Sequence, residues 1–248
     1  MQKVALVTGG AAGIGHACCL RLAKAGNAIG VLDLDEQRCA GTVRAIEAAG
    51  GKALALGADI SDRRQVQAAL AKLRAVLGPV SIVVNNAGMA EFIPFEEITD
   101  ERWDKMFAVN VRGTFIVTQE AIPDMKAAGW GRIVNISSSS AQTGTRVQVH
   151  YSASKGAIVS LTRSLADALG PYGITVNNIP PGSVMHTIMS EANRERFPIP
   201  IETMTANMPV RRLGEPEDIA NACAWLCDEA TGYVTGQTIG VNGGRVVS

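Results

Sequence analysis

The sequence has no excess of charge of either sign, since 23 lysines and arginines balance 23 aspartates and glutamates. Such a balance leaves no electrostatic footprint for nucleic acid or for an anionic membrane surface. Long apolar runs are also missing, so no segment is expected to span a bilayer. The first residues lead directly into a strand-like segment without the features of a signal peptide. We therefore expect a protein that binds neither nucleic acid nor membranes.

Cysteine is scarce and unpatterned, with five residues in the whole chain. An odd number without framework spacing argues against disulfides and fits a reducing, cytoplasmic location. Cys223 and Cys227 are four positions apart on a predicted helix, a spacing that could supply half of a metal site. No histidine or second cysteine pair lies nearby in the sequence, so we expect buried thiols and no metal.

What the sequence does have is alternation between short β-branched runs and longer helical patterns. Hydrophobic residues make up 47% of its 248 residues and charged residues 19%, which excludes a disordered chain. Seven strands are predicted, at 4–7, 28–32, 53–56, 80–84, 132–136, 174–179 and 238–241. Helices are predicted at 16–25, 37–49, 63–77, 101–128 (with a possible interruption at Pro123) and 151–169. This order predicts a single α/β domain over residues 1–248, a Rossmann-type, doubly wound parallel sheet.

One segment, residues 180–209, departs from this regularity. It holds five of the ten prolines together with Met185 and Met189. We interpret it as a substrate loop with an adaptable, mainly apolar surface.

A glycine-rich turn follows the first predicted strand and opens the first helix. Gly9, Gly13 and Gly15 would allow a tight turn and the close approach of a pyrophosphate to the helix N-terminus. Taken alone, the pattern also fits an ordinary βα turn, but the flanking strand and helix are those of a dinucleotide site. A Walker-type loop is excluded, because His16 and Ala17 stand where lysine and serine or threonine are required.

Asp33 ends the second predicted strand, about 20 residues beyond this turn, where a carboxylate can accept hydrogen bonds from ribose hydroxyls. A 2′-phosphate would meet that carboxylate, and Leu34 adds no positive charge. The sequence therefore predicts NAD(H) over NADP(H). The alternative is that Asp33 caps the next helix, for which Asp35 is better placed.

Tyr151 and Lys155 are four residues apart, so they are neighbours on one helix face. A nearby ammonium and the positive nicotinamide of NAD⁺ would favour the phenolate and so lower the tyrosine pKa. Lowering this pKa by about 3 units requires the phenolate to be stabilised by roughly 4 kcal/mol relative to the phenol. Alternatively, the two residues form an ordinary pair on a surface helix.

Three further polar features accompany the Tyr151–Lys155 pair: the serines at 137–140, the asparagines at 85–86 and Asn110. Each also has a purely structural interpretation. The serines could form a flexible loop, the asparagines a turn, and Asn110 could be a buried structural amide.

These motifs, in this order, resemble the short-chain dehydrogenase/reductase family over essentially the whole chain, and most closely its compact branch of 3-oxoacyl-(acyl-carrier-protein) reductases and alcohol dehydrogenases. The resemblance implies that Tyr151 is the general acid/base and that Lys155 lowers its pKa and binds the nicotinamide ribose. It also implies that Ser138 orients the substrate oxygen and that Asn110 supports a water-linked proton relay.

The resemblance also assigns the cofactor site. The residues it places there are Gly9, Gly13, Ile14, Gly15, Asp33, Leu34, Asp59, Ile60, Asn86, Ala87, Tyr151, Lys155, Pro181, Gly182 and Val184. Asp59 and Ile60 would lie beside the adenine, and Pro181, Gly182 and Val184 would flank the nicotinamide. The chain departs from the family pattern at Thr187, which comes one residue late.

The expected function is an NAD-dependent oxidoreductase that interconverts a secondary alcohol and a ketone, possibly of 3-oxoacyl type. One alternative is a catalytically silent NAD-binding redox sensor, which would need no proton donor. Another is an epimerase or dehydratase, but those relatives resemble longer chains. By resemblance we also expect a homotetramer in which the helices from Glu101 and from Tyr151 form an interface.

Overall fold

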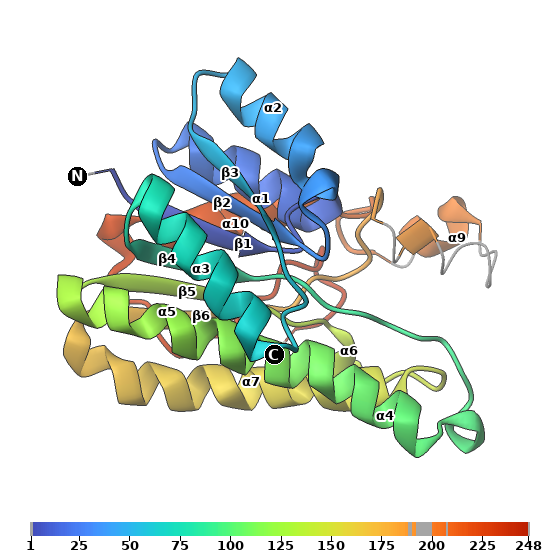
Figure 1. Cartoon of the computed structure of the whole chain (residues 1–248). Coiled ribbons are helices and arrows are strands. Elements are labelled where there is room, and N and C mark those ends of the chain that lie inside the picture. The colour runs from blue at the N-terminus through green and yellow to red at the C-terminus, as the bar shows by residue number, and fades with distance from the viewer. Residues whose placement is uncertain (1, 188–189, 192–199, 207, 248) are drawn as a thin grey trace.

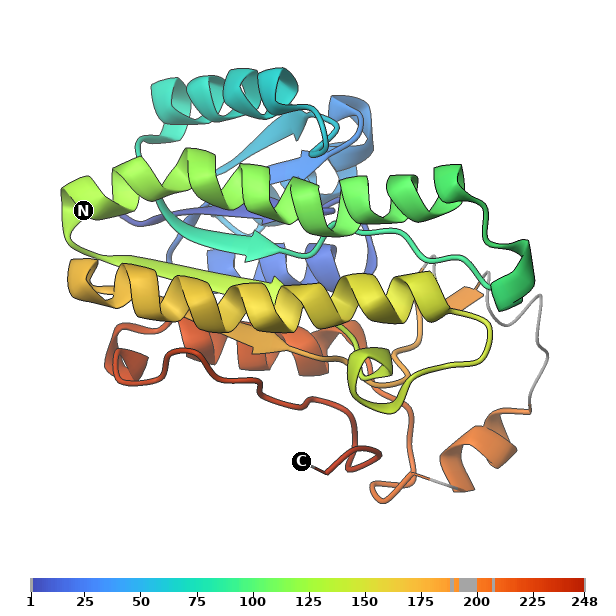
Figure 2. The same ribbon diagram turned by 90° about the horizontal axis from the view of Figure 1, so that it is seen from below.

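A parallel sheet lies between two layers of helices (Figures 1 and 2). The computed structural model describes residues 2–187, 190–191, 200–206 and 208–247. Within them the sheet has six strands in the order β3-β2-β1-β4-β5-β6. The strands are β1 (Val4–Thr8), β2 (Ala28–Asp33), β3 (Ala53–Gly57), β4 (Val80–Asn85), β5 (Gly131–Ile136) and β6 (Ile174–Ile179). The order reverses between β1 and β4, which places a crevice at the carboxyl ends of these two strands.

The two faces of the sheet are covered by different helices. One face packs against α1 (Gly13–Lys24), α2 (Ala40–Ala48) and α10 (Pro216–Cys227), and the other against α3 (Arg63–Leu77), α5 (Thr114–Ala128) and α7 (Val149–Leu169). The remaining helical elements are η1 (Glu36–Cys39), η2 (Phe95–Glu97), α4 (Asp100–Phe107), η3 (Ala108–Gly113), α6 (Ser140–Thr143), η4 (Gly170–Tyr172), α9 (Ile201–Ala206) and η5 (Glu229–Thr231).

The strands are apolar on both sides because both faces are covered. In β1, Val4 and Leu6 pack into the core beneath α3, α5 and α7. Ala5 and Val7 point the other way, into the core shared with α1 and α10. All four are buried, as predicted for a strand of a doubly covered parallel sheet.

The seventh predicted strand, 238–241, is not formed as a strand. Thr238 and Val241 instead make two isolated parallel bridges, to Asn178 and Pro181. A continuous ladder is blocked because Pro180 and Pro181 follow β6 directly and have no backbone N–H to donate. The segment therefore lies along the edge of β6 without completing a strand.

The predicted helix 101–128 is divided, but not at Pro123. The segment runs as α4, then one stretch of π-helix (η3), then α5, which continues through Pro123. Figure 2 shows these elements as one long rod beside α7. Helix 63–77 is formed with the predicted bounds. The other predicted helices are formed with boundaries shifted by a few residues, and helix 37–49 begins with the short η1.

The cysteines and the 180–209 segment complete the fold. All five cysteines are buried and free, and burial raises the pKa of the Cys39 thiol. The described residues of the 180–209 segment include α9, whereas Met189 lies outside them. No helix among the described residues is long and apolar enough to cross a membrane.

Candidate active site

The turn between β1 and α1 is built so tightly that it requires glycine. Gly9 and Gly13 have φ angles of +64° and +52°, in the left-handed region that L side chains rarely adopt. A Cβ on Gly15 would lie 2.0 Å from the carbonyl oxygen of Gly9. A side chain at any of these three positions would therefore strain the turn or collide with it.

The N-terminus of α1 has the chemistry of an anion site. Its N-cap residue is Ala12, no side chain caps the helix by a hydrogen bond, and its first turn carries no acidic residue. The first amide groups and the helix dipole thus point toward the glycine turn without a protein anion to satisfy them. This arrangement fits the pyrophosphate of a dinucleotide.

The end of β4 holds the glycine turn in place. The Asn86 side-chain amide donates to the carbonyl oxygens of Thr8 (3.0 Å) and Gly9 (3.2 Å). The Thr8 hydroxyl accepts hydrogen bonds from the backbone amides of Asn86 and Ala87, both at 3.0 Å. Asn86 and Ala87 are therefore at the site, where they brace the turn. Thr8 is the first residue of the glycine-rich motif, but the sequence alone did not assign it a role.

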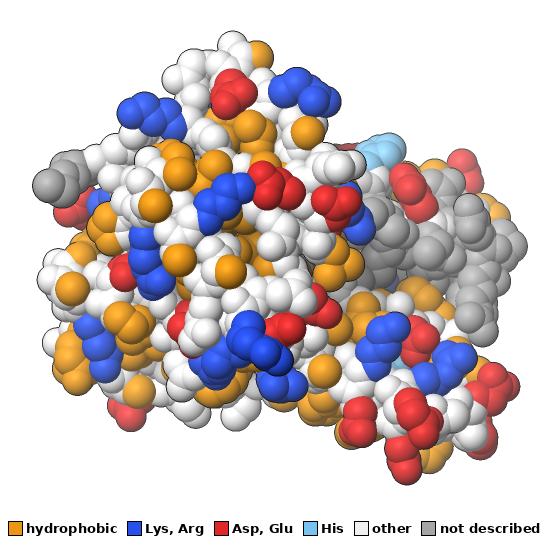
Figure 3. All heavy atoms as spheres, in the orientation of Figure 1, with side chains coloured by type: hydrophobic (Ala, Val, Ile, Leu, Met, Phe, Trp, Pro, Cys, Tyr) orange, Lys and Arg blue, Asp and Glu red, His pale blue; other side chains and the backbone are white. Residues whose placement is uncertain are grey.

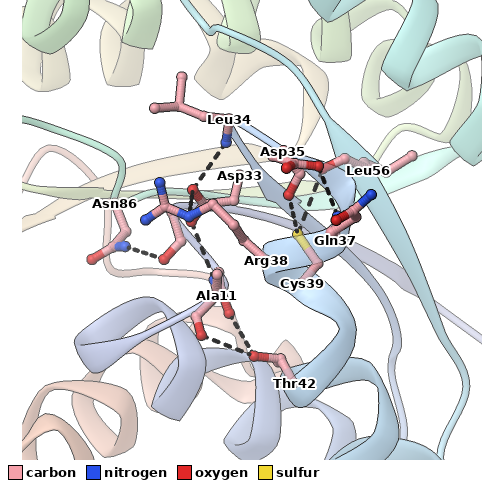
Figure 4. A network of polar contacts seen from close by, with 12 residues as sticks. Ala11, Asp33, Leu34, Asp35, Gln37, Arg38, Cys39, Thr42, Leu56 and Asn86 are labelled. Atoms are coloured by element: carbon pink, nitrogen blue, oxygen red, sulfur yellow. Dashed lines mark hydrogen bonds and ion pairs between the residues drawn. The ribbon is translucent and has the colours of Figure 1, made fainter.

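Asp33 lies beside the turn, at the end of β2 (Figure 4). One carboxylate oxygen accepts the Leu34 amide at 2.9 Å and the other accepts the Ala11 amide at 3.4 Å. Capping of the next helical turn falls to Asp35, which accepts the Gln37 amide at 2.9 Å. The alternative role for Asp33, as a helix cap, is therefore wrong.

Arg38 is a second charged group at this position that the sequence analysis did not identify. Its Nε lies 3.3 Å from the Asp33 carboxylate (Figure 4). Arg38 comes five residues after Asp33, beyond the end of the strand, so a motif based on the strand end does not include it. The reversal of the chain in η1 brings the guanidinium back to the carboxylate.

The tyrosine and serine predicted to act on substrate meet at the carboxyl end of β5. Tyr151, near the start of α7, is 6% exposed, and a hydrogen bond joins its side chain to that of Ser138. Burial raises the pKa of Tyr151, while the bond to Ser138 opposes that rise. Ser140 supports Ser138, since its hydroxyl donates to the Ser138 hydroxyl at 2.9 Å.

Lys155 is close to Tyr151 and is itself buried. Its ammonium lies 5.8 Å from the centre of the Tyr151 ring and donates to the Ile136 carbonyl at 2.9 Å. Desolvation lowers the pKa of Lys155 to about 8. The lowered pKa expected for Tyr151 includes the charge of bound NAD⁺, so it stays a prediction for the complex with cofactor.

Asn110 occupies the π-helical segment η3 and is almost fully buried. Its amide exchanges two hydrogen bonds with the backbone of Met89 (2.8 and 3.0 Å) and donates to the Ser154 hydroxyl at 3.0 Å. A Cβ on Gly88 would lie 3.1 Å from the Asn110 side-chain oxygen and 3.3 Å from the Lys155 ammonium. Asn110 therefore fixes the loop after β4 against α7. The absence of a side chain at Gly88 leaves room for the Asn110 and Lys155 side chains.

The remaining predicted cofactor residues lie after β3, in the first turn of α1 and beyond β6. The Asp59 carboxylate accepts hydrogen bonds from the backbone and hydroxyl of Ser61, and the Ile60 side chain packs beneath Gly113. Gly182 is so close to Asn242 that a Cβ there would lie 2.9 Å from its Cα. The remaining members are Ile14, Pro181 and Val184; Ile14 is in the first turn of α1, and the other two form bridges beyond β6.

Thr187, the late threonine, does reach the glycine turn. Its side chain lies 3.2 Å from the position of a Cβ on Gly13. The preceding residue, His186, has a φ of +54°, so the extra residue is taken up as a left-handed step. The departure in spacing thus leaves Thr187 beside the turn.

Comparisons with known proteins find reductases that are similar to this chain over almost its whole length. A family model described as enoyl-(acyl carrier protein) reductase matches residues 9–245. The chain is 41% identical to nodulation protein G of Azospirillum brasilense and 36% identical to acetoacetyl-CoA reductase of Cupriavidus necator, in each case over 98% of both chains. A crystal structure of an actinorhodin polyketide ketoreductase variant with NADPH is similar, with a TM-score of 0.94, 33% identity, and coverage of 98% of this chain and 97% of that one.

Proposed function

Because the chain belongs to the short-chain dehydrogenase/reductase family, an oxidoreductase family acting on hydroxy and keto groups, we propose that Ser138, Tyr151 and Lys155 interconvert a secondary alcohol and a ketone here. The observation that carries the proposal is the convergence of these three side chains at the carboxyl end of β5. The acetoacetyl-CoA reductase relative favours a 3-oxoacyl substrate. A nicotinamide dinucleotide, when bound, supplies or accepts the hydride.

Tyr151 moves the proton. Burial keeps its phenol protonated at neutral pH, which suits a group that donates a proton to a ketone oxygen during reduction. Ser138, already bonded to Tyr151, holds that oxygen in place. The Lys155 ammonium stabilises the phenolate as it forms. A catalytically silent redox sensor remains the second candidate, and the complete set of proton-handling side chains speaks against it.

We assign the pyrophosphate to the N-terminus of α1 and the adenosine ribose to Asp33. The carboxylate of Asp33 accepts two amide hydrogen bonds and has lone pairs left for ribose hydroxyls. It repels a 2′-phosphate, which favours NAD(H) over NADP(H). The proposal differs here from the ketoreductase relative, whose structure was determined with NADPH.

Two copies of the chain are proposed to meet through the surface formed by α4, η3, α5 and α7. A shallow apolar hollow on this surface is lined by Asp104, Phe107, Ala108, Val111, Arg112, Phe115, Ala157 and Leu161. Its apolar floor favours contact with protein over water. Two of its lining residues, Asp104 and Arg112, carry opposite charges that can pair across a two-fold axis. The homotetramer is proposed from family resemblance.

Turnover by Tyr151→Phe tests this function. With NADH and a panel of 3-oxoacyl thioesters and simple ketones, we expect the variant to lose at least about 100-fold in kcat/KM, the usual contribution of a general acid. NADH binding, measured by fluorescence, should stay close to that of the wild type. Turnover equal to the wild type on any accepted substrate would contradict the mechanism. Cofactor binding with no turnover by the wild type on the whole panel would favour the sensor.

A further inference from the structure

A histidine beside the catalytic tyrosine is buried but has no part in the mechanism proposed above. His150 precedes Tyr151 in the first turn of α7, and its side chain is fully buried. Its Nε2 lies 3.4 Å from a carboxylate oxygen of Glu91. Its Nδ1 is buried and has no hydrogen-bond partner within the part of the chain that the structure describes. A buried polar atom without a partner costs stability, so packing alone does not account for an imidazole here.

Glu91 connects three elements. One carboxylate oxygen faces the His150 Nε2, and the other lies 3.2 Å from a guanidinium nitrogen of Arg102 in α4. Because a carboxylate only accepts hydrogen bonds, Nε2 is the ring nitrogen that carries the proton. Glu91 thus ties the loop after β4 both to the start of α7 and to α4.

This loop follows the catalytic turn of α7. At its start, Gly88 is so close to the helix that a Cβ there would lie 3.3 Å from the Lys155 ammonium. Three residues further along, Glu91 reaches His150, which comes five residues before that lysine. Residues 88–91 therefore lie along the stretch of α7 that carries the catalytic tyrosine and lysine, both of which are at most 6% exposed.

We propose that His150 is a positioning residue, which through Glu91 holds residues 88–91 against α7 and keeps water away from Tyr151 and Lys155. The inference rests on the proposed function, because it concerns the same site. Exclusion of water strengthens the charge interactions among the reacting groups. Desolvation is also the cause of the lowered pKa of Lys155, so water admitted by a detached loop would raise this pKa toward its ordinary value.

Two substitutions separate the hydrogen bond from the packing. In His150→Gln a side-chain amide can still donate, whereas His150→Leu fills a similar volume without a donor. We expect His150→Leu to lower kcat/KM for ketone reduction about tenfold, as for the loss of one hydrogen bond to a charged group. The pH at which Lys155 loses its charge and reduction slows, about 8 in the wild type, should rise. His150→Gln should stay close to the wild type in both respects.

Glu91→Gln tests the other partner and should change the rate and the pH profile in the same direction. Its matched control is Glu96→Gln, which removes an exposed carboxylate from η2, just beyond the loop, and should change neither. An unchanged rate in His150→Leu, or a loss of rate without a shift of the pH profile, would overturn the proposal. Should His150→Leu fail to fold, Glu91→Gln against Glu96→Gln decides in the same way.

Hydrogen–deuterium exchange tests the loop without turnover. The amides of Met89 and Ile93 donate hydrogen bonds to the Asn110 side chain and the Val147 carbonyl, both at 2.8 Å. We expect these amides to exchange faster in His150→Leu than in the wild type or His150→Gln. Equal exchange in all three proteins would overturn the positioning role. Faster exchange in His150→Leu, combined with a wild type that reduces no ketone, would support the contact and contradict the proposed function instead.

Discussion

At the scale of single residues, burial decides the charge state of the catalytic groups. Desolvation raises the pKa of Tyr151 and lowers that of Lys155 to about 8. The spacing in the sequence places these two side chains on one helix face, whereas the lowered pKa that it predicts for the tyrosine beside bound NAD⁺ stays a prediction. The spacing of the residues reports their proximity, whereas the loss of water around Tyr151 depends on β5 and the loops that cover it.

The pKa of Lys155 predicts how reduction depends on pH. Below pH 8 the side chain is an ammonium, and as the pH rises through about 8 it loses the charge that stabilises the developing phenolate. We therefore expect kcat/KM for ketone reduction to fall above pH 8 with the slope of a single ionisation. In Lys155→Arg the charge persists, so this fall should disappear although the rate is lower. A flat profile for the wild type between pH 7 and 9 would contradict the assignment.

The lowered pKa of Lys155 also determines how the stability of the protein changes with pH. The folded-state pKa of about 8 is below the ordinary value of 10.5, so between these pH values the unfolded chain binds more protons at Lys155. This group therefore makes the protein more stable as the pH rises through that window. The loss of activity above pH 8 is thus distinct from unfolding.

At the scale of elements, short-range patterns predicted the fold well except where distant groups intervene. Six strands were confirmed, because apolar runs of this length suit a sheet covered on both faces. The seventh failed at the prolines that follow β6. The interruption of helix 101–128 lies at η3, where the Asn110 side chain bonds to Met89, a contact that no local pattern reveals. Gly9, Gly13 and Gly15 could be read directly, since their spacing reflects local backbone geometry.

Two helical glycines, Gly15 of α1 and Gly41 of α2, allow this geometry to be tested. A Cβ on Gly15 would collide with the Gly9 carbonyl oxygen, whereas a Cβ on Gly41 meets nothing within 4 Å. We expect Gly15→Ala to destabilise the protein by about 1–3 kcal/mol and to abolish NADH binding. Gly41→Ala should stabilise it by about 0.5–1 kcal/mol and leave binding unchanged. Urea unfolding and NADH fluorescence measure both effects, and normal NADH binding by Gly15→Ala would count against the pyrophosphate site.

At the scale of the whole molecule, charge and apolar surface are distributed differently. On the face shown in Figure 3, basic and acidic side chains are interspersed without a large area of one sign. This agrees with the balance of charges in the sequence. The apolar hollow lined by residues of α4, η3, α5 and α7 is the surface proposed to bind a second copy. Figure 2 shows these helices running side by side.

Phe115 provides the test of that surface. It is 43% exposed at the hollow, where a carboxylate would have to be buried against apolar side chains of the second copy. We expect Phe115→Asp to lower the mass measured by light scattering, because burying an unpaired charge costs more than one interface side chain contributes. Val76→Asp is the control, since Val76 is 59% exposed on α3 and away from the hollow. The proposed interface is wrong if Phe115→Asp keeps the wild-type mass, or if the wild type itself has the mass of a monomer. Because Asn110 and Tyr151 lie on elements that form this surface, dissociation should also reduce turnover more than it reduces NADH binding.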